Sequence, residues 1–333
     1  MADTPMDRAV ALAERGPAHG PNPRVGCVIV RDGTVIAEGY HKGAGTLHAE
    51  ADALVAAAVS GQSVEGATAY VTLEPCNHTG RTGPCAVALA DARVAKVVYA
   101  VPDPNPTAAG GADYLASRGV TVELAPHAGA HALNRRWLVA MARQRPYVIA
   151  KWAATLDGRT AAADGTSFWI TGEEAREHAH GVRATVDAIV VGTGTVATDN
   201  PELSARPRGV VDPHQPLRIV MGERSTEGAK VWRDANAERV ASRSPSVGLE
   251  KAWQRECRVV LVEGGATVTS AFLAAGLVDE VHAYIAPAIL GDGPAAVSGL
   301  GIGTMAEALR GTDVTVTRLG ADTLVTAIFM KET

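Results

Sequence analysis

The sequence predicts an α/β protein of two domains, each a sheet covered by helices. Short apolar, β-branched runs alternate along the chain with Ala-rich stretches of helical spacing, an order typical of such layers. A length of 333 residues suits about two domains of roughly 150 residues each. Gln144-Arg145-Pro146 breaks a helix, and a second series of strands and helices begins after it. We therefore expect domains at 1–144 and 145–333.

Local signals place the elements of the first domain. Asp32-Gly33 separates two apolar runs and predicts a hairpin, Pro84 suits a first helical turn, and Pro21-Asn22-Pro23 predicts a loop. The expected helices cover residues 6–15, 48–60, 84–91 and 130–143. The expected strands cover residues 25–30, 34–39, 67–73 and 97–101.

The second domain continues the alternation of apolar runs and helical stretches. A turn is expected at Asp157-Gly158-Arg159, and helices are expected at 172–183 and 267–275. Residues 222–256 are polar and carry no pattern that places an element. The expected strands cover residues 147–153, 188–191, 217–221, 259–262, 281–286, 314–317 and 324–329.

The composition argues against several classes of partner. A net charge of -5 without a basic stripe disfavours duplex nucleic acid. No membrane span is expected, because no apolar run is long enough, and the N-terminus lacks the pattern of a signal peptide. We therefore expect a cytoplasmic protein without a disulfide framework, in which a cysteine motif serves metal binding or catalysis.

One imidazole, one carboxylate and two thiols form the most specific motif of the chain. His48-Ala49-Glu50 and the later Cys76 and Cys85 match the zinc-deaminase pattern of one His and two Cys ligands with a nearby Glu. We predict that His48, Cys76 and Cys85 bind zinc and that Glu50 is the general acid/base. Three ligands leave the fourth tetrahedral position to water, as in catalytic zinc sites. The eight residues between the cysteines depart from the usual two.

A structural zinc site is the competing interpretation. His78 could complete a set of four ligands, and His48 could instead be a helix cap or a core residue. The carboxylate two residues after His48 and the proline before Cys76 favour the catalytic version, with His78 as a pocket wall or a substrate contact. Cys27 and Cys257 lie outside the motif and are expected to be packed thiols.

With its neighbours, this motif resembles the deaminase half of the bifunctional riboflavin-biosynthesis deaminase–reductase family. Residues 21–26, 39–41, 43–50, 72–85 and 103–106 carry the resemblance. The family has a cytidine-deaminase-like three-layer domain in which the longer loop between the cysteines is normal. The resemblance implies that Asn22, His41 and Asn105 contact the pyrimidine or ribose and that Arg81 contacts the substrate phosphate. As pattern alone, these residues could also be turn-formers or solvated loop residues.

Pattern alone leaves the second domain open. No Gly-x-Gly-x-x-Gly opens a helix, and Gly192-x-Gly194 is only half of one. The strand at 259–262 runs into Glu263-Gly264-Gly265 and a helix. Such a junction can bring backbone and a helix N-terminus to a phosphate, or it can be a tight turn.

The resemblance extends to the reductase half of the same family, which is similar to dihydrofolate reductases in fold. Residues 145–151, 156–160, 169–172, 199–203, 263–265 and 276–280 carry it. It implies a dinucleotide site made of Ala153, Trp169, Thr195, Asp199, Gly265, Ala266, Thr267, Val268, Thr269, Ser270 and Ala271. It implies a substrate site made of Ser167, Arg183, Leu203, Arg206 and Glu263.

Charged residues of this half bear on the binding of the substrate phosphate and on the choice of cofactor. Arg183 and Arg206 suit a ribose phosphate, because a guanidinium binds its oxygens bidentately, although Arg183 could also be a solvated helix residue. Gly222-Glu223 stands where the family usually has Asp-Ser near the cofactor ribose. A Glu there would repel a 2′-phosphate unless Arg224 compensates, so NADPH is expected and NADH is not excluded.

By this resemblance, the chain is a bifunctional enzyme of riboflavin biosynthesis. Its first domain would be a zinc-dependent deaminase of 2,5-diamino-6-(5-phosphoribosylamino)pyrimidin-4(3H)-one, and its second an NADPH-dependent reductase that converts the ribosyl group to ribityl. A homo-oligomer, dimer or tetramer, is expected. The alternatives are an active deaminase with a degenerate reductase, a nucleotide-binding regulator with a structural zinc, and a nucleic-acid deaminase, which the acidic net charge disfavours.

Overall fold

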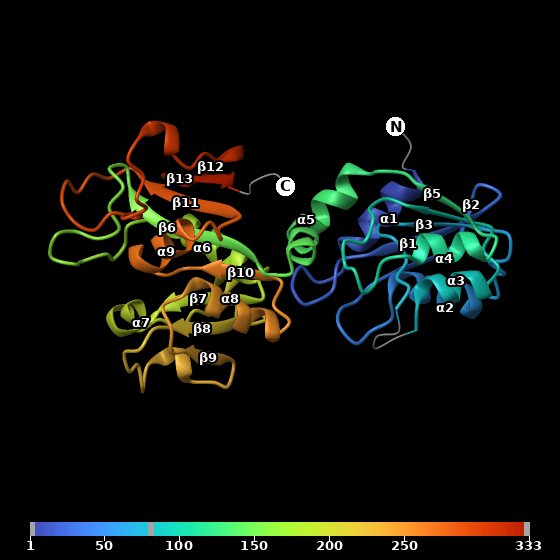
Figure 1. The fold of residues 1–333 in the computed structure, drawn as a ribbon, viewed down its shortest axis with the longest axis horizontal. Helices are drawn as coiled ribbons and strands as arrows, with labels where there is room; N and C mark the ends of the chain where they lie inside the picture. Colours follow the sequence, from blue (N-terminus) through green and yellow to red (C-terminus); the bar gives the residue numbers. More distant parts are fainter. Residues whose placement is uncertain (1–3, 79–82, 330–333) are drawn as a thin grey trace. The chain divides into compact units, whose positions relative to one another are not determined.

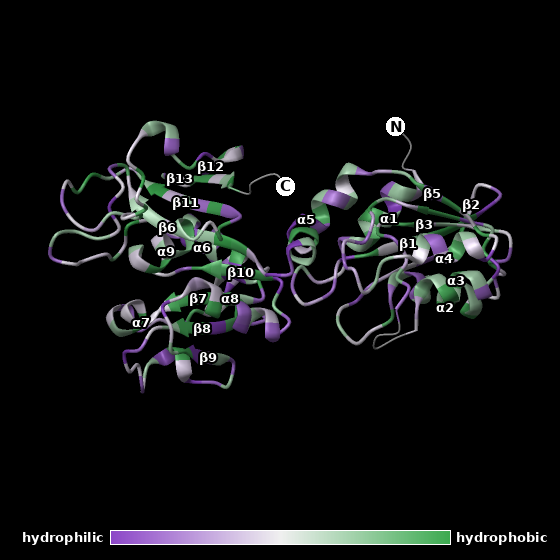
Figure 2. Cartoon of the chain, viewed as in Figure 1, coloured by the Kyte–Doolittle hydropathy of each residue, from purple (hydrophilic) through white to green (hydrophobic). Residues whose placement is uncertain are grey.

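The structure, a computed structural model, describes residues 4–78 and 83–329 (Figure 1). The chain divides into two compact units, residues 1–144 and 145–333. Hydrophobic residues concentrate in the strands of each unit (Figure 2), so each unit has a core of its own. Within the described ranges, no helix is long and apolar enough to cross a membrane.

The first unit contains a five-stranded sheet in the order β2-β1-β3-β4-β5. Its strands are β1 (Gly26–Arg31), β2 (Thr34–Tyr40), β3 (Thr68–Val71), β4 (Lys96–Tyr99) and β5 (Thr121–Leu124). Strands β1 and β2 form the predicted antiparallel hairpin, whereas β3, β4 and β5 are parallel to one another. The carboxyl ends of β3 and β4 therefore lie at the same edge of the sheet.

Helices cover both faces of this sheet and make three layers. They are α1 (Pro5–Ala13), α2 (Ala49–Val59), α3 (Cys85–Asp91), α4 (Gly111–Ser117) and α5 (Ala128–Arg143). A Cβ on Gly26 would lie 2.0 Å from the Ala9 carbonyl oxygen of α1, and a Cβ on Gly39 would lie 2.3 Å from the Ala53 nitrogen of α2. Gly39 pairs with the neighbour of Gly26, so the two glycines face opposite sides. Helices α1 and α2 consequently pack on opposite faces.

The second unit contains an eight-stranded mixed sheet in the order β12-β13-β11-β6-β10-β7-β8-β9. The strands are β6 (Tyr147–Thr155), β7 (Ala188–Gly192), β8 (Leu217–Met221), β9 (Ala237–Val240), β10 (Val259–Val262), β11 (Glu280–Ala286), β12 (Thr312–Leu319) and β13 (Asp322–Ile328). The run from β11 to β9 is parallel, whereas β13 and β12 are antiparallel at one edge. The parallel strands therefore end at one shared edge, the usual position of a ligand site in such sheets.

The helices of the second unit connect these parallel strands. They are α6 (Glu173–Arg183), α7 (Thr193–Asp199), α8 (Pro245–Gln254) and α9 (Ala266–Ala274), with short 3-10 turns η1 (Pro207–Gly209), η2 (Lys230–Trp232) and η3 (Met305–Glu307). Apolar residues of β6, β7, β8 and β10 form one large core with residues of α8 and α9. Phe272 of α9 is fully buried in it.

Several elements differ from the sequence-based expectation. No element was expected between 106 and 130, where α4 and β5 lie, and the expected strand at 67–73 contracts to β3. The unassigned segment 222–256 contains η2, β9 and α8. Strand β9 has four residues at the edge of the sheet, and its Ala-Glu-Arg-Val sequence gives only a weak strand pattern.

Candidate active sites

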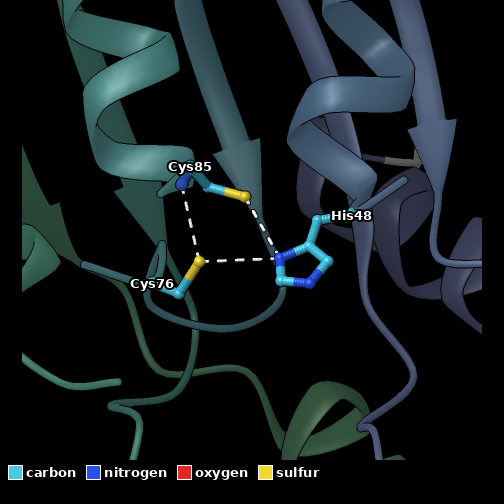
Figure 3. A group of neighbouring side chains, drawn as sticks. All are labelled: His48, Cys76 and Cys85. Carbon is cyan, nitrogen blue, oxygen red and sulfur yellow. Dashed lines mark hydrogen bonds between the residues drawn. The ribbon is translucent and has the colours of Figure 1, made fainter. Parts of the chain in front are cut away.

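The predicted zinc ligands come together from three segments of the first unit (Figure 3). His48 is the N-cap residue of α2, Cys85 is the first residue of α3, and Cys76 lies in the loop after β3. The His48 Nδ1 atom lies 3.5 Å from the Cys76 Sγ and 3.3 Å from the Cys85 Sγ. The fold thus converts a spacing of 37 residues along the chain into one side-chain cluster.

The cluster has the size of a zinc site. Tetrahedral zinc with bonds of about 2.0–2.3 Å to nitrogen and sulfur holds its ligand atoms about 3.5–3.8 Å apart. The three ligand atoms here all lie within 4.8 Å of one another. Among the described residues, His78 is not part of the group, so the four-ligand structural site gains no support. The donor set therefore fits a zinc ion with one position left for water.

Electrostatics prepare this cluster for a cation and for proton transfer. A hydrogen bond from the Cys85 thiol, with further ones from His48 and the Cys85 backbone N–H, lowers the pKa of Cys76 to about 4 despite its burial. Burial, and then the negative charge of Cys76, raises the pKa of Glu50 to about 7. Glu50 is 4% exposed, so its carboxyl group can change protonation near neutral pH inside a largely dry site.

Two of the predicted substrate residues contact each other beside the cluster. The His41 Nε2 atom lies 2.9 Å from the Asn22 Nδ2, and the His41 Nδ1 lies 2.9 Å from the Leu47 carbonyl oxygen. The His41 ring meets the His48 ring edge to face, with centroids 5.4 Å apart. Trp137 of α5 donates to the Pro21 carbonyl oxygen at 2.8 Å and so fixes the loop that carries Asn22. Both His41 ring nitrogens are therefore occupied within the protein.

The other predicted residues of this site have different positions. Asn105 accepts hydrogen bonds from the Thr107 backbone and hydroxyl, at 3.2 and 2.8 Å, so its carbonyl oxygen serves a turn. Arg81 lies outside the described residues. Sequence reasoning missed Glu74, which accepts from the Gly110 and Asp103 backbone N–H groups and holds that loop beside Cys76. Its position directly before Pro-Cys was the available signal.

The second unit has a cavity of about 650 Å³ at the carboxyl edge of its parallel strands. It is bounded by residues at the ends of β6, β7, β8 and β10 and by the first turns of α7 and α9. Ten of the predicted cofactor and substrate residues line it, namely Ala153, Ser167, Thr195, Asp199, Glu263, Gly265, Ala266, Thr267, Val268 and Ala271.

Glycines allow the wall of this cavity to close tightly. A Cβ on Gly264 would lie 2.5 Å from the Val268 Cβ, and a Cβ on Gly192 would lie 2.8 Å from the Val268 Cγ2. The Gly265 N–H donates to the Thr195 hydroxyl at 3.2 Å. The N-terminus of α9 is consequently pressed against the ends of β7 and β10 and exposes its backbone to the cavity.

The remaining predicted residues do not line the cavity. Thr269 and Ser270 are buried on the other side of α9, where Thr269 donates to the Gly264 carbonyl oxygen and Ser270 accepts from the Ser298 N–H. Leu203 is buried, and Arg206 forms an exposed ion pair with Glu202. Trp169 is 69% exposed and stacks under the Arg176 guanidinium.

Arg183 is not a solvated helix residue. Its guanidinium binds both oxygens of Glu263, at 2.6 and 2.8 Å, and also donates to the Ser204 carbonyl oxygen. The Lys151 Nζ lies 3.6 Å from the same carboxylate. Burial alone would raise the pKa of Glu263, but the charges of Arg183 and Lys151 outweigh burial and lower it to about 2. Glu263 is therefore an anion that holds Lys151 at the cavity wall.

Sequence reasoning missed three cations of this cavity wall as functional candidates. Lys151 was part of the family motif but received no role, and Arg224 was considered only as compensation for Glu223. Arg243 lies in the segment that carried no recognisable pattern. The available signal for Arg224 was its position just beyond the expected strand at 217–221, whereas Arg243 follows a strand that the sequence did not indicate.

Comparisons with protein families agree with this division into two sites. Residues 2–101 match the cytidine and deoxycytidylate deaminase zinc-binding region. Residues 146–325 match the RibD C-terminal domain. The confirmed α/β architecture thus combines a cytidine-deaminase-like unit with a RibD reductase unit.

Curated relatives and solved structures cover nearly the whole chain. The riboflavin biosynthesis protein RibD of Corynebacterium ammoniagenes is 44% identical over 82% of each chain, and that of Mycobacterium tuberculosis is 43% identical over 92% of this chain and 91% of its own. The Acinetobacter baumannii RibD structure superposes with a TM-score of 0.89 at 38% identity, covering 98% of both chains.

A Thermotoga maritima structure gives the same result with a more explicit description. It is described as a diaminohydroxyphosphoribosylaminopyrimidine deaminase/5-amino-6-(5-phosphoribosylamino)uracil reductase, and it superposes with a TM-score of 0.86 at 32% identity over 98% of both chains. This chain therefore belongs to the RibD family of bifunctional riboflavin-biosynthesis deaminase–reductases.

Proposed function

We propose that the unit at 1–144 deaminates 2,5-diamino-6-(5-phosphoribosylamino)pyrimidin-4(3H)-one and that the unit at 145–333 reduces the product with NADPH. The Thermotoga maritima relative is described with these two activities. The observation that carries the first activity is the His48, Cys76 and Cys85 cluster with the buried Glu50. The cavity of about 650 Å³ at the strand ends supports the second activity.

The residues of the first unit can carry out hydrolytic deamination. Zinc held by His48, Cys76 and Cys85 would supply a Lewis acid that makes water reactive at neutral pH. Glu50 accepts a proton from the attacking water and returns it to the leaving amine, so that the ring carbon gains oxygen and ammonia departs. Burial, which raises the pKa of Glu50, suits this carboxyl group to both steps. Asn22 and His41, fixed by α5 and the Leu47 carbonyl, form the wall on which the pyrimidine rests.

The residues of the second unit can position a hydride transfer. Reduction of the ring-opened sugar adds a hydride to C1′, and the adjoining nitrogen must take up a proton. Lys151 lines the cavity and its ammonium group is held by Glu263, so it is the proton donor in this proposal. Arg183 neutralises the rest of the Glu263 charge, which leaves the Lys151 proton free to move toward substrate.

We further propose that the enzyme acts in the cytoplasm as a homo-oligomer, a dimer or tetramer, on this phosphorylated small molecule. The acidic net charge of -5 supports a small-molecule substrate over nucleic acid. Light scattering of the purified chain would test the oligomer: a mass of one chain would refute it.

One experiment tests both activities. Zinc-loaded enzyme is supplied with the diaminopyrimidine phosphate and NADPH, and ammonia and NADPH are followed separately. We expect one ammonia per substrate and then one NADPH oxidised per ammonia. No ammonia would refute the deaminase. Ammonia without NADPH oxidation would instead support the alternative of a degenerate reductase unit.

A further inference from the structure

The cavity of the second unit has two chemically different ends. Lys151 of β6 and Glu263 after β10 lie at one end, whereas Glu223 and Arg224 after β8 and Arg243 after β9 lie at the other. In the strand order β6-β10-β7-β8-β9, Lys151 on β6 is separated from β8 by three strand spacings and from β9 by four. That is about 14–19 Å at roughly 4.8 Å per spacing. A ligand that uses both ends must be extended, as a dinucleotide is.

The charges at the two ends are paired differently. Lys151 contacts the Glu263 carboxylate, which also binds Arg183. Arg224 and Arg243 are exposed side chains of the cavity wall, and neither forms an ion pair with any residue in the part of the chain that the structure describes. Together with Glu223, these side chains carry two positive charges and one negative charge.

The backbone holds this charged group in place. Arg239 of β9 donates from one guanidinium nitrogen to the Glu223 carbonyl oxygen at 2.7 Å and to the Arg224 carbonyl oxygen at 3.3 Å. Gly222 has a φ of +124°, and a Cβ there would lie 2.6 Å from the Thr193 hydroxyl. An Asp at 222, the residue that the family pattern suggests, would be strained in this conformation. The charged side chains that follow β8 and β9 and line this part of the cavity are therefore those of 223, 224 and 243.

We infer that Arg224 and Arg243 bind the 2′-phosphate of NADPH, and that Glu223 opposes it, so that these three side chains set the cofactor preference. The 2′-phosphate is the group that distinguishes NADPH from NADH. Two guanidinium groups bind a phosphate through charge-assisted hydrogen bonds, whereas a carboxylate accepts hydrogen bonds from a free ribose diol and repels phosphate. The inference rests on the proposed reductase function.

The test measures binding rather than turnover. Full-length, zinc-loaded enzyme is titrated calorimetrically with adenosine 2′,5′-bisphosphate and with 5′-AMP. The dissociation constant of 5′-AMP divided by that of the bisphosphate is the ratio that reports 2′-phosphate recognition. Arg224→Gln and Arg243→Gln should each reduce this ratio about tenfold, the loss expected for one charge-assisted hydrogen bond. Glu223→Gln should increase the ratio. Arg233→Gln, which alters an exposed arginine paired with Glu202 outside the cavity, is the matched control and should leave it unchanged.

Opposite effects of neighbouring substitutions separate recognition from a structural role. An unchanged ratio in both arginine variants, an equal loss for both probes, or a wild type that prefers 5′-AMP would overturn the inference. Failure of the reductase proposal looks different, because a wild type that oxidises no NADPH in the presence of substrate refutes the activity whatever the probes do. Far-UV circular dichroism and the thermal unfolding curve of each variant check that the second unit, which has its own core, is folded. If a Gln variant does not fold, the Lys variant at the same position, which keeps the charge, replaces it and should lose less of the ratio.

Discussion

The two units hold their functional residues in opposite ways. The first unit gathers its zinc ligands into one cluster less than 5 Å across, from two helix starts and one loop. The second unit spreads its functional residues along the ends of several parallel strands, around a cavity of about 650 Å³. A small ion needs few donors at fixed distances, whereas an extended cofactor needs contacts along its whole length. The residues of the first kind of site lie in short sequence motifs, whereas those of the second kind are brought together by the topology of the sheet.

The two sites also differ in how they treat charge. Burial of Glu50 and the negative charge of Cys76 outweigh the hydrogen bonds and the His48 charge that stabilise its anion, so its pKa rises to about 7. Glu263 is equally inaccessible, but Arg183 and Lys151 keep its pKa near about 2. The first carboxyl is therefore suited to carry protons, and the second to hold a cation in position.

The strongest test of this contrast is Glu50→Gln. Loss of a general acid/base lowers a rate by about 10²–10⁴-fold. We expect the rate of ammonia release to fall by close to 10⁴-fold, while the reduction of substrate that is already deaminated continues. Ammonia and NADPH assays on the same preparation measure both. Glu65→Gln, at an exposed residue paired with Arg93, is the control. Undiminished ammonia release from Glu50→Gln would contradict the assignment.

The corresponding change in the second unit is Lys151→Gln. Removal of the proton donor should lower the turnover of NADPH oxidation by about 10²–10³-fold with little change in NADPH affinity. Ammonia release should stay at the wild-type level. Stopped-flow absorbance at 340 nm measures the reduction step. Lys251→Gln, which alters a half-exposed lysine paired with Glu238, should retain full turnover. A variant that loses affinity instead would make Lys151 a binding residue.

A smaller effect is expected in the acid stability of the second unit. The pKa of Glu263 in the folded protein, about 2, lies below its ordinary value of 4.5. Its stabilising contribution is therefore complete above pH 4.5 and is lost as the pH falls toward 2. Between pH 4.5 and 3, the free energy of unfolding of the wild type should fall by about 2 kcal/mol because of this group. Glu263→Gln should not show this part of the decrease.

Scanning calorimetry across this pH range measures that difference. At neutral pH the same variant should already be less stable, because Arg183 is left buried without its carboxylate. Glu250→Gln, at an exposed residue of α8, should follow the wild type at every pH. Parallel pH curves for the wild type and Glu263→Gln would show that the Glu263 carboxyl group is not coupled to the folded state.

The smallest expected effect concerns the cysteines outside the motif. Cys257 is buried in the core of the second unit, where burial raises the pKa of its thiol to about 12. Cys257→Ala should therefore leave zinc content and ammonia release unchanged and cost about 1 kcal/mol in stability. Elemental analysis measures the zinc, with Cys85→Ala as the variant that should lose it. Loss of zinc from Cys257→Ala would show that the motif does not hold all the metal.

The zinc cluster could be predicted from the sequence because its three ligands, together with Glu50, lie in two short motifs whose spacing reflects local chemistry. The reductase site was harder to predict, because the family resemblance implies a continuous segment, residues 265–271, for the dinucleotide site. A helix presents only some of its side chains to one face, so Thr269 and Ser270 of α9 are buried in the core while Val268 and Ala271 line the cavity.

The missing elements have physical reasons as well. Helix α8 begins at Pro245 and contains Gly248, which meets the Met221 side chain closely, so tertiary packing rather than propensity specifies this helix. Helix α4 begins with the pair Gly110-Gly111, and a Cβ on Gly111 would lie 1.6 Å from the Pro75 carbonyl oxygen. Gly111 and Gly248 look like helix breakers in sequence and are sites of close approach in the fold.

The junction between the units lies at a single peptide bond. The Gln144 side chain donates back to the Met141 carbonyl oxygen of α5. The next residue, Arg145, binds both oxygens of the buried Asp279, each at 2.7 Å, and Asp279 also accepts from the Val148 N–H. Each side of the bond is therefore anchored in its own unit. The gene can be divided after codon 144, or lengthened there with a flexible linker, and each half should keep its own contacts.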